Sequence, residues 1–144
     1  MFLISHRGNT DGRILSMENN PAYIEDALKK GYGVEIDVRV KGEQIMLGHD
    51  KADHVVSKKF LQQAGIWCHA KNIEALQYMI DNNITCFWHE RDMYSLTSNG
   101  YIWTFPGEVA QKKSIVVHNT DTPFNADAFG ITISGICSDY IERF

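Results

Sequence analysis

The sequence lacks several features that mark particular protein classes. It contains only three prolines, and it has no apolar run approaching the roughly 18 residues of a membrane-spanning helix. It also lacks a basic excess, because 18 acidic residues outnumber 14 lysines and arginines and give a net charge of −4. Nucleic-acid-binding surfaces are usually basic. We therefore expect no nucleic-acid partner and no membrane span.

Cysteine is scarce as well. Cys68, Cys86 and Cys137 are odd in number and widely spaced, and no C-x-x-C pair occurs, which argues against a disulfide framework and a zinc knuckle. Their positions inside apolar runs are typical of buried, reduced thiols in a cytoplasmic protein. The opening apolar run, residues 2–4, is too short for a signal peptide. Since 44% of the 144 residues are apolar, we expect one cytoplasmic domain, residues 1–144, with a substantial core.

Short apolar runs dominate the rest of the chain. Two helices are expected, one from Pro21 after an Asn20 cap to a stop at Gly31, and one from an Asn72 cap to Asn82. The runs that we interpret as strands are residues 2–5, 33–40, 45–47, 66–69, 84–88, 101–105, 114–117 and 131–137. Both expected helices lie in the first part of the chain, among the strands, and only strands are expected after the second helix.

Residues 33–40 alternate in character. Valine and isoleucine share one face of the expected strand, so Glu35, Asp37 and Arg39 share the other. Residues two apart on a strand lie roughly 6–7 Å apart, so the two carboxylates repel each other. A hard divalent cation bound between them removes this repulsion, since Mg²⁺ and Ca²⁺ take oxygen ligands. The alternative is an exposed face on which Arg39 pairs with the acids.

Five of the six histidines directly follow an apolar run. In α/β barrels the carboxyl ends of the parallel strands meet on one face, where active sites are built. The pattern therefore predicts a polar pocket ringed by strand ends. The five are His6, His49, His69, His89 and His118.

Two histidines and an arginine near a metal suit phosphoryl transfer. The metal and Arg7 would neutralise the phosphate oxygens, because a guanidinium can bind two of them at once. Of His6 and His49, one would take a proton from the nucleophile and the other would give one to the leaving alkoxide. An imidazole pKa of about 6.5 suits both steps.

Several segments carry a family resemblance. HRGN, MEN, AYIEDALKKG and VEIDVRVKGEQIMLGHD, followed near the C-terminus by GICSDY, resemble in order and spacing the glycerophosphodiester phosphodiesterase family. That family's pattern is HRG, PEN, E-x-D-V, a hairpin ending in HD, and a final strand with G-I-x-T-D-x-P. The resemblance implies a metal-dependent phosphodiesterase acting on a small-molecule phosphodiester. In the family a hydroxyl next to the phosphate attacks first, and water then opens the cyclic phosphate.

The resemblance also implies roles for individual residues. His6 and His49 would be the acid–base pair and Arg7 would contact phosphate, while Glu18 and Asn19, in MEN, would support the site. Glu35 and Asp37 would bind the metal, as their spacing also indicates.

The family's third metal ligand is an acid two residues before a lysine. Here His69 precedes Lys71, which would face the phosphate, and Glu90 on the next strand is the alternative ligand. With oxygen ligands the cofactor would be Mg²⁺ or Ca²⁺, whereas His69 would also suit Mn²⁺ or Zn²⁺.

The resemblance implies a (β/α)₈ barrel, yet such barrels take about 250 residues. We therefore expect an α/β fold, a reduced (β/α)₈ TIM-type barrel with several helices missing after the second. Strand surface left uncovered would favour a homo-oligomer.

Two other functions compete with phosphodiester hydrolysis. One is a non-catalytic, degenerate barrel that binds phosphodiesters or phosphosugars, which the short chain and the altered third ligand favour. The other is a zinc hydrolase built from His69, His89 and His118 with Glu90.

Overall fold

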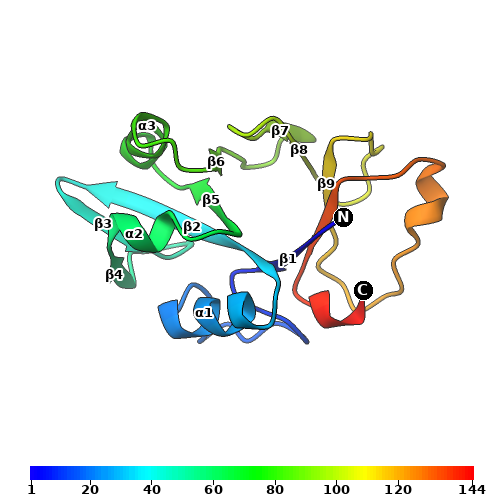
Figure 1. The fold of residues 1–144 in the computed structure, drawn as a ribbon, viewed down its shortest axis with the longest axis horizontal. Coiled ribbons are helices and arrows are strands. Elements are labelled where there is room, and N and C mark those ends of the chain that lie inside the picture. The colour runs from blue at the N-terminus through cyan, green and yellow to red at the C-terminus, as the bar shows by residue number, and fades with distance from the viewer.

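A mixed ten-stranded sheet dominates the computed structural model, which describes residues 1–144 (Figure 1). The strands are β1 (Phe2–His6), β2 (Gly33–Lys41), β3 (Gln44–Leu47), β4 (His54–Val56), β5 (Ile66–Ala70), β6 (Cys86–Phe87), β7 (Tyr94–Leu96), β8 (Ile102–Thr104), β9 (Ser114–Val117) and β10 (Gly135–Ser138). The helices are α1 (Pro21–Lys29), α2 (Lys58–Leu61) and α3 (Ile73–Asp81), with 3₁₀ turns η1 (Ala126–Phe129) and η2 (Ile141–Arg143).

Seven of the strands run parallel, in the spatial order β6, β5, β2, β1, β10, β9, β8. β7 pairs antiparallel with β8, and β3 and β4 extend β2 as an antiparallel meander. The first strand lies between β2 and the last strand. Residues from both ends of the chain therefore meet at the centre of the sheet.

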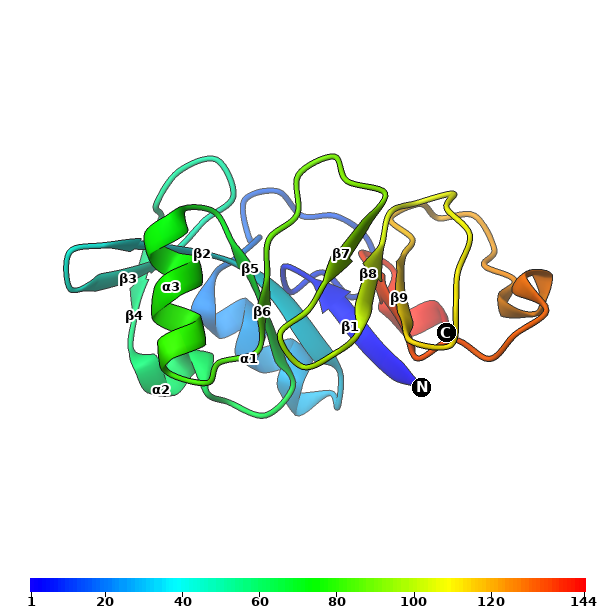
Figure 2. The same ribbon diagram turned by 90° about the horizontal axis from the view of Figure 1, so that it is seen from above.

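The expected reduced (β/α)₈ TIM-type barrel is wrong. The protein is a mixed, mostly β structure in which only α1 and α3 reach nine residues. Residues 105–113 join the parallel strands β8 and β9, and this connection is shorter than the dozen or so residues that a crossover helix needs. Residues 118–134 contain only η1, which Figure 2 shows at one end of the molecule. Neither connection therefore carries a crossover α-helix.

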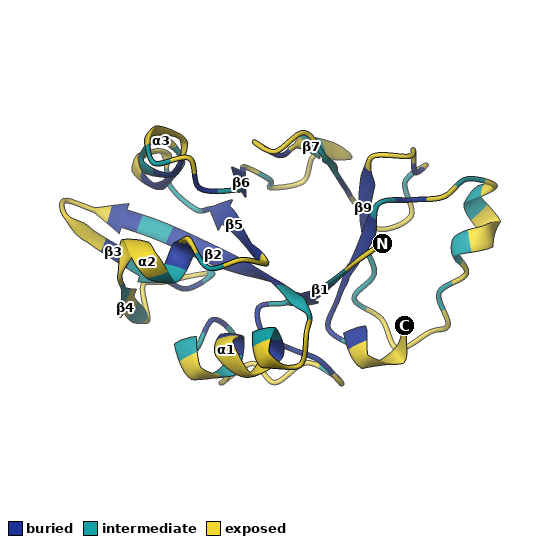
Figure 3. Ribbon diagram, in the orientation of Figure 1, coloured by how far each residue is buried: buried dark blue, intermediate teal, exposed yellow.

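The core lies on both faces of the sheet. On one face, Val34, Ile36 and Val38 of β2 pack with β5, α1 and α3 in a cluster of 16 buried residues. On the other face, side chains from six strands pack together, and the rings of Phe87 and Trp103 stack 4.3 Å apart. β6 and β8, which are far apart in the sheet order, therefore approach each other. Figure 3 shows the buried strands between exposed helix surfaces.

The local expectations are largely confirmed. Helices α1 and α3 begin where predicted, after Asn20 and Asn72. Residues 33–40 form β2, whose valines and isoleucine join the core while its two acids group with His69. Sequence analysis missed β4, β7 and α2, which have three or four residues each. No helix is both long and apolar enough to cross a bilayer. Leu96 and Val109 are exposed, and a homo-oligomer that would cover such surface stays a prediction.

Asn72 ties α3 to β2 and provides a test of the fold. Its Oδ1 accepts hydrogen bonds from the Ala75 and Val40 amides, and its Nδ2 donates to the Val40 carbonyl. We expect Asn72→Ala to lower the free energy of unfolding by about 2–3 kcal/mol, because a cap and two sheet contacts are lost. Asn20→Ala removes only a cap and should cost about 1 kcal/mol. Urea unfolding of both variants measures this difference, and equal losses would contradict the prediction.

Candidate functional site

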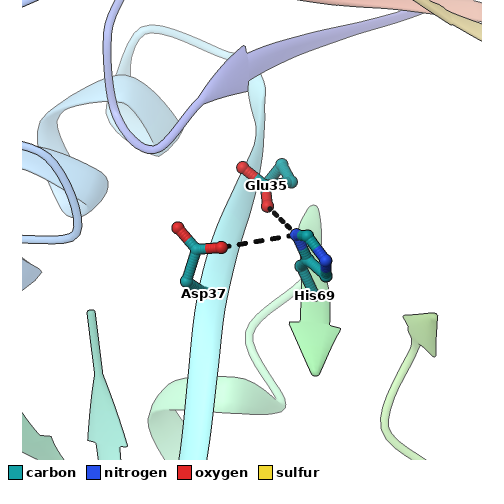
Figure 4. Close-up of side chains that lie close together, drawn as sticks. All are labelled: Glu35, Asp37 and His69. Atoms are coloured by element: carbon teal, nitrogen blue, oxygen red, sulfur yellow. Dashed lines mark ion pairs between the residues drawn. The ribbon is translucent and has the colours of Figure 1, made fainter. Parts of the chain in front are cut away.

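Two adjacent parallel strands bring together Glu35, Asp37 and His69 (Figure 4). Nδ1 of His69 lies 3.4 Å from Oε1 of Glu35 and 3.3 Å from Oδ1 of Asp37. All three residues are buried, and one potential ligand atom from each lies within 4.8 Å of the others. We call these three residues the carboxylate–histidine cluster.

The His69 ring is held from two sides. Its Nε2 donates a hydrogen bond to the His89 carbonyl at 2.6 Å, since a carbonyl oxygen can only accept. The ring also stacks on Phe87 with centroids 5.1 Å apart and planes 15° apart. These contacts fix the tautomer and the ring orientation, so that Nδ1 faces the two carboxylates.

The cluster strongly shifts the pKa values of its members. Burial alone lowers the pKa of His69, but the Asp37 and Glu35 carboxylates outweigh burial and raise it to about 9. Burial alone raises the pKa of Asp37, but contact with His69 and the charge of Arg7 hold it well below its usual range. Without a metal, a proton on Nδ1 therefore compensates the carboxylates.

The cluster fits a divalent cation. Glu35 Oε2 and Asp37 Oδ1 are buried and accept no hydrogen bond, and a buried oxygen without a partner is costly. Carboxylate oxygens and an imidazole nitrogen are ligands that divalent metals use. A cation held by Glu35, Asp37 and His69 would give these oxygens a partner.

Arg7 and Asn19 hold Asp37 in place. Arg7 directly follows β1, and its Nε lies 3.0 Å from Asp37 Oδ2. Asn19 donates to the same oxygen at 2.8 Å and accepts from the Asp37 backbone amide at 2.9 Å. Both residues have positive φ angles, 57° and 60°, in the left-handed region that non-glycine residues seldom adopt. Such backbone strain is often found at functional sites.

Glu18 anchors this arrangement from the first loop. Arg7 donates to it at 3.0 Å, Arg13 at 2.6 Å and Asn9 at 3.3 Å. Burial raises the pKa of Glu18, but the hydrogen bonds from the two arginines outweigh burial and lower it. Glu18 and Asn19 thus contact Arg7 and Asp37, the residues that we expected them to support. Nη2 of Arg7 makes no hydrogen bond within the protein, so one guanidinium nitrogen remains for a ligand.

His6 ends β1 next to Glu35. Its Nδ1 lies 2.8 Å from Asp139 Oδ1, and its Nε2 lies 3.8 Å from Glu35 Oε2. Asn9 donates to the same Asp139 oxygen at 2.7 Å. With the Asp139 carboxylate ionised, Nδ1 is the donor, and Nε2 is left to accept a proton. Sequence analysis missed Asp139 as a site residue, although it follows an apolar strand as the histidines do.

The remaining predicted residues line one cleft of about 510 Å³, which we call the metal-side cleft. His49 follows β3 with a half-exposed side chain, and its Nδ1 contacts Asp50 at 2.7 Å. Lys71 lines the cleft without an ion pair in the protein. Glu90 lines it too, but it is exposed and lies outside the carboxylate–histidine cluster. The predicted residues on this cleft are His6, Arg7, Glu35, His49, His69, Lys71, His89 and Glu90.

His118 does not line this cleft, although its neighbours Val117 and Asn119 do. Its Nε2 is 2.8 Å from the Thr122 carbonyl oxygen, and its ring meets that of Phe124 edge-on at 5.1 Å. The structure therefore does not assemble His69, His89 and His118 with Glu90 into a zinc site.

Comparison with protein-family models, curated proteins and solved structures finds no match for this chain. Its function is therefore inferred from the chemistry of the cleft and from motifs within the sequence.

The raised pKa of His69 predicts a pH-dependent stability of the metal-free protein. An imidazole with a pKa of about 9 when folded and about 6.5 when unfolded stabilises the fold fully below pH 6.5. This stabilisation, up to about 3 kcal/mol, disappears as the pH rises through 9. Urea unfolding in EDTA from pH 6 to 10 should show this loss in the wild type and in His118→Gln. His69→Gln should not show it, and a flat wild-type profile would contradict the prediction.

Proposed function

We propose that the protein is a metal-dependent hydrolase of small-molecule phosphodiesters related to glycerophosphodiesters. One observation carries the proposal: His6 and His49 line the same cleft as Glu35 and His69 of the carboxylate–histidine cluster. The HRGN, MEN and E-x-D-V motifs, on which the family resemblance depends, all contribute side chains to this cleft or to its support.

The negative charge of the phosphate has several partners. A metal held by Glu35, Asp37 and His69 would supply Lewis-acid neutralisation of the phosphate oxygens. Lys71, which has no ion pair, adds a positive charge on the wall of the metal-side cleft. Nη2 of Arg7 is a further donor, while the rest of the guanidinium orients Asp37 and Glu18. Arg7 thus serves both the phosphate and the metal ligands.

His6 and His49 carry out the proton transfers. Nε2 of His6 takes the proton of a substrate hydroxyl next to the phosphate, and that oxygen forms a new bond to phosphorus. Asp139 holds the ring and stabilises the imidazolium that forms. The bond to the leaving alkoxide breaks, and His49 gives that oxygen a proton. Water then opens the cyclic phosphate with the same two groups in reversed roles.

A non-catalytic phosphodiester-binding protein is the second candidate. The exposure of His49 favours it, because the only hydrogen-bond partner of the side chain is Asp50, which is itself 92% exposed. A proton donor held so loosely is poorly placed for catalysis, whereas binding needs only the metal and Lys71.

Activity assays distinguish the two candidates. We expect turnover of glycerophosphocholine with a divalent metal, and its loss in EDTA. Bis-p-nitrophenyl phosphate has no hydroxyl next to its phosphate, so it should react far more slowly. His6→Ala and His49→Ala should each lower kcat by about 10²–10⁴-fold, the usual contribution of general acid–base groups. His118→Ala, outside the cleft, should keep full activity. Binding of substrate without turnover in Mg²⁺, Ca²⁺, Mn²⁺ or Zn²⁺ would rule out the hydrolase and favour the binding protein.

Asp139 should act through His6. We expect Asp139→Asn to lower kcat at least about tenfold with little change in KM, because the substituted amide no longer stabilises the imidazolium. The same change in a His6→Ala background should cause almost no further loss, since the two residues act as a unit. Independent, additive losses in this double-mutant cycle would show that Asp139 has only a structural role.

A further inference from the structure

We propose that the carboxylate–histidine cluster selects a first-row transition-metal ion, Zn²⁺ or Mn²⁺, over Mg²⁺ and Ca²⁺, and that His69 makes this selection. The inference rests on the proposed function only for the presence of a divalent metal. It concerns which ion the protein binds, whether or not turnover follows.

The donor set is the first step. Ca²⁺ takes 6–8 oxygen ligands, and Mg²⁺ also prefers oxygen. The protein offers carboxylates only from Glu35 and Asp37, and the third member of the cluster is a nitrogen. Glu90, which would complete an all-oxygen set, is exposed and outside the cluster. Imidazole is a good ligand for Zn²⁺ and a poor one for Ca²⁺.

The second step is the fixed orientation of His69. The His89 carbonyl occupies Nε2 at 2.6 Å, so the ring can offer only Nδ1 to a metal. Phe87 stacks on one face of the ring and is itself stacked on Trp103. A rotation that removed the nitrogen from the cluster would break the hydrogen bond and disturb both stacks. Outer-shell partners of this kind commonly change metal affinity about 10–100-fold.

The third step is the set of partners around Nδ1. The Glu35 and Asp37 oxygens are its nearest partners, and Oδ1 of Asp37 accepts no hydrogen bond. One nitrogen and two carboxylate oxygens thus lie within 4.8 Å of one another, and a cation bound there would replace the proton on Nδ1. The order of stability for divalent ions at such sites places Zn²⁺ above Mn²⁺.

Titration of the EDTA-stripped, desalted protein with ZnCl₂, MnCl₂, MgCl₂ and CaCl₂ tests the inference. Isothermal calorimetry at one pH should give Kd values for Zn²⁺ and Mn²⁺ at least about tenfold below those for Mg²⁺ and Ca²⁺. Equal or tighter binding of Mg²⁺ or Ca²⁺ would overturn it, as would binding of none of the four ions.

A second measurement assigns the selection to His69. Pulsed EPR of the Mn²⁺-loaded wild type should show coupling to a directly bound imidazole nitrogen, and so should the control His118→Gln. His69→Glu should lose this coupling and bind Mn²⁺ and Mg²⁺ with Kd values within about threefold of each other, because its set is all oxygen. If this variant does not fold, nitrogen coupling in the wild type still decides the question, and its absence would overturn the inference.

The two proposals fail in different ways. Transition-metal selectivity without turnover would contradict the hydrolase and leave this inference standing. Turnover with preferential binding of Mg²⁺ would contradict this inference and support the hydrolase.

Discussion

The burial of two like charges on one face of β2 is the constraint on which the site depends. Glu35 and Asp37 are almost inaccessible to water, and removing such charges from water costs several kcal/mol each unless they are compensated. Arg7, Asn19 and His69 provide the compensation from the first loop and the neighbouring strand. The strained backbone at Arg7 and Asn19 is tolerated because it places their polar groups against Asp37.

The same strand builds the core. Side chains alternate along β2, so Val34, Ile36 and Val38 pack under α1 and α3 while the two acids group with His69 on the other face. A slip of one residue in the register would exchange the two faces, burying the acids among apolar groups and leaving the valines beside His69. The hydrophobic core and the polar site therefore enforce one register together, and substitutions on either face of β2 affect both.

Local features of the sequence were predictable and long-range ones were not. The Asn72 cap and the alternation at Glu35 and Asp37 depend on neighbouring residues, so reading along the chain was sufficient. The hairpin of β7 has strands of three residues, too short to show a period. Asp139 lies 133 positions from its partner His6, and no local pattern pairs them. The prediction of a barrel was wrong for a related reason. The motifs that resemble the family lie mostly in the first fifty residues, and they do not determine how the rest of the chain connects its strands.

The position of β1 between β2 and β10 has a consequence for biosynthesis. The carboxylate–histidine cluster is encoded within the first 69 residues, whereas the anchor of His6 arrives only with Asp139 on the last strand. On the ribosome, Glu35, Asp37 and His69 therefore emerge before Asp139, which holds His6. Pairing of strands that are far apart in the sequence is slow, because the entropy of loop closure is lost before the stabilising contacts form. The side chain of His6 would thus be fixed only when the last strand pairs with β1.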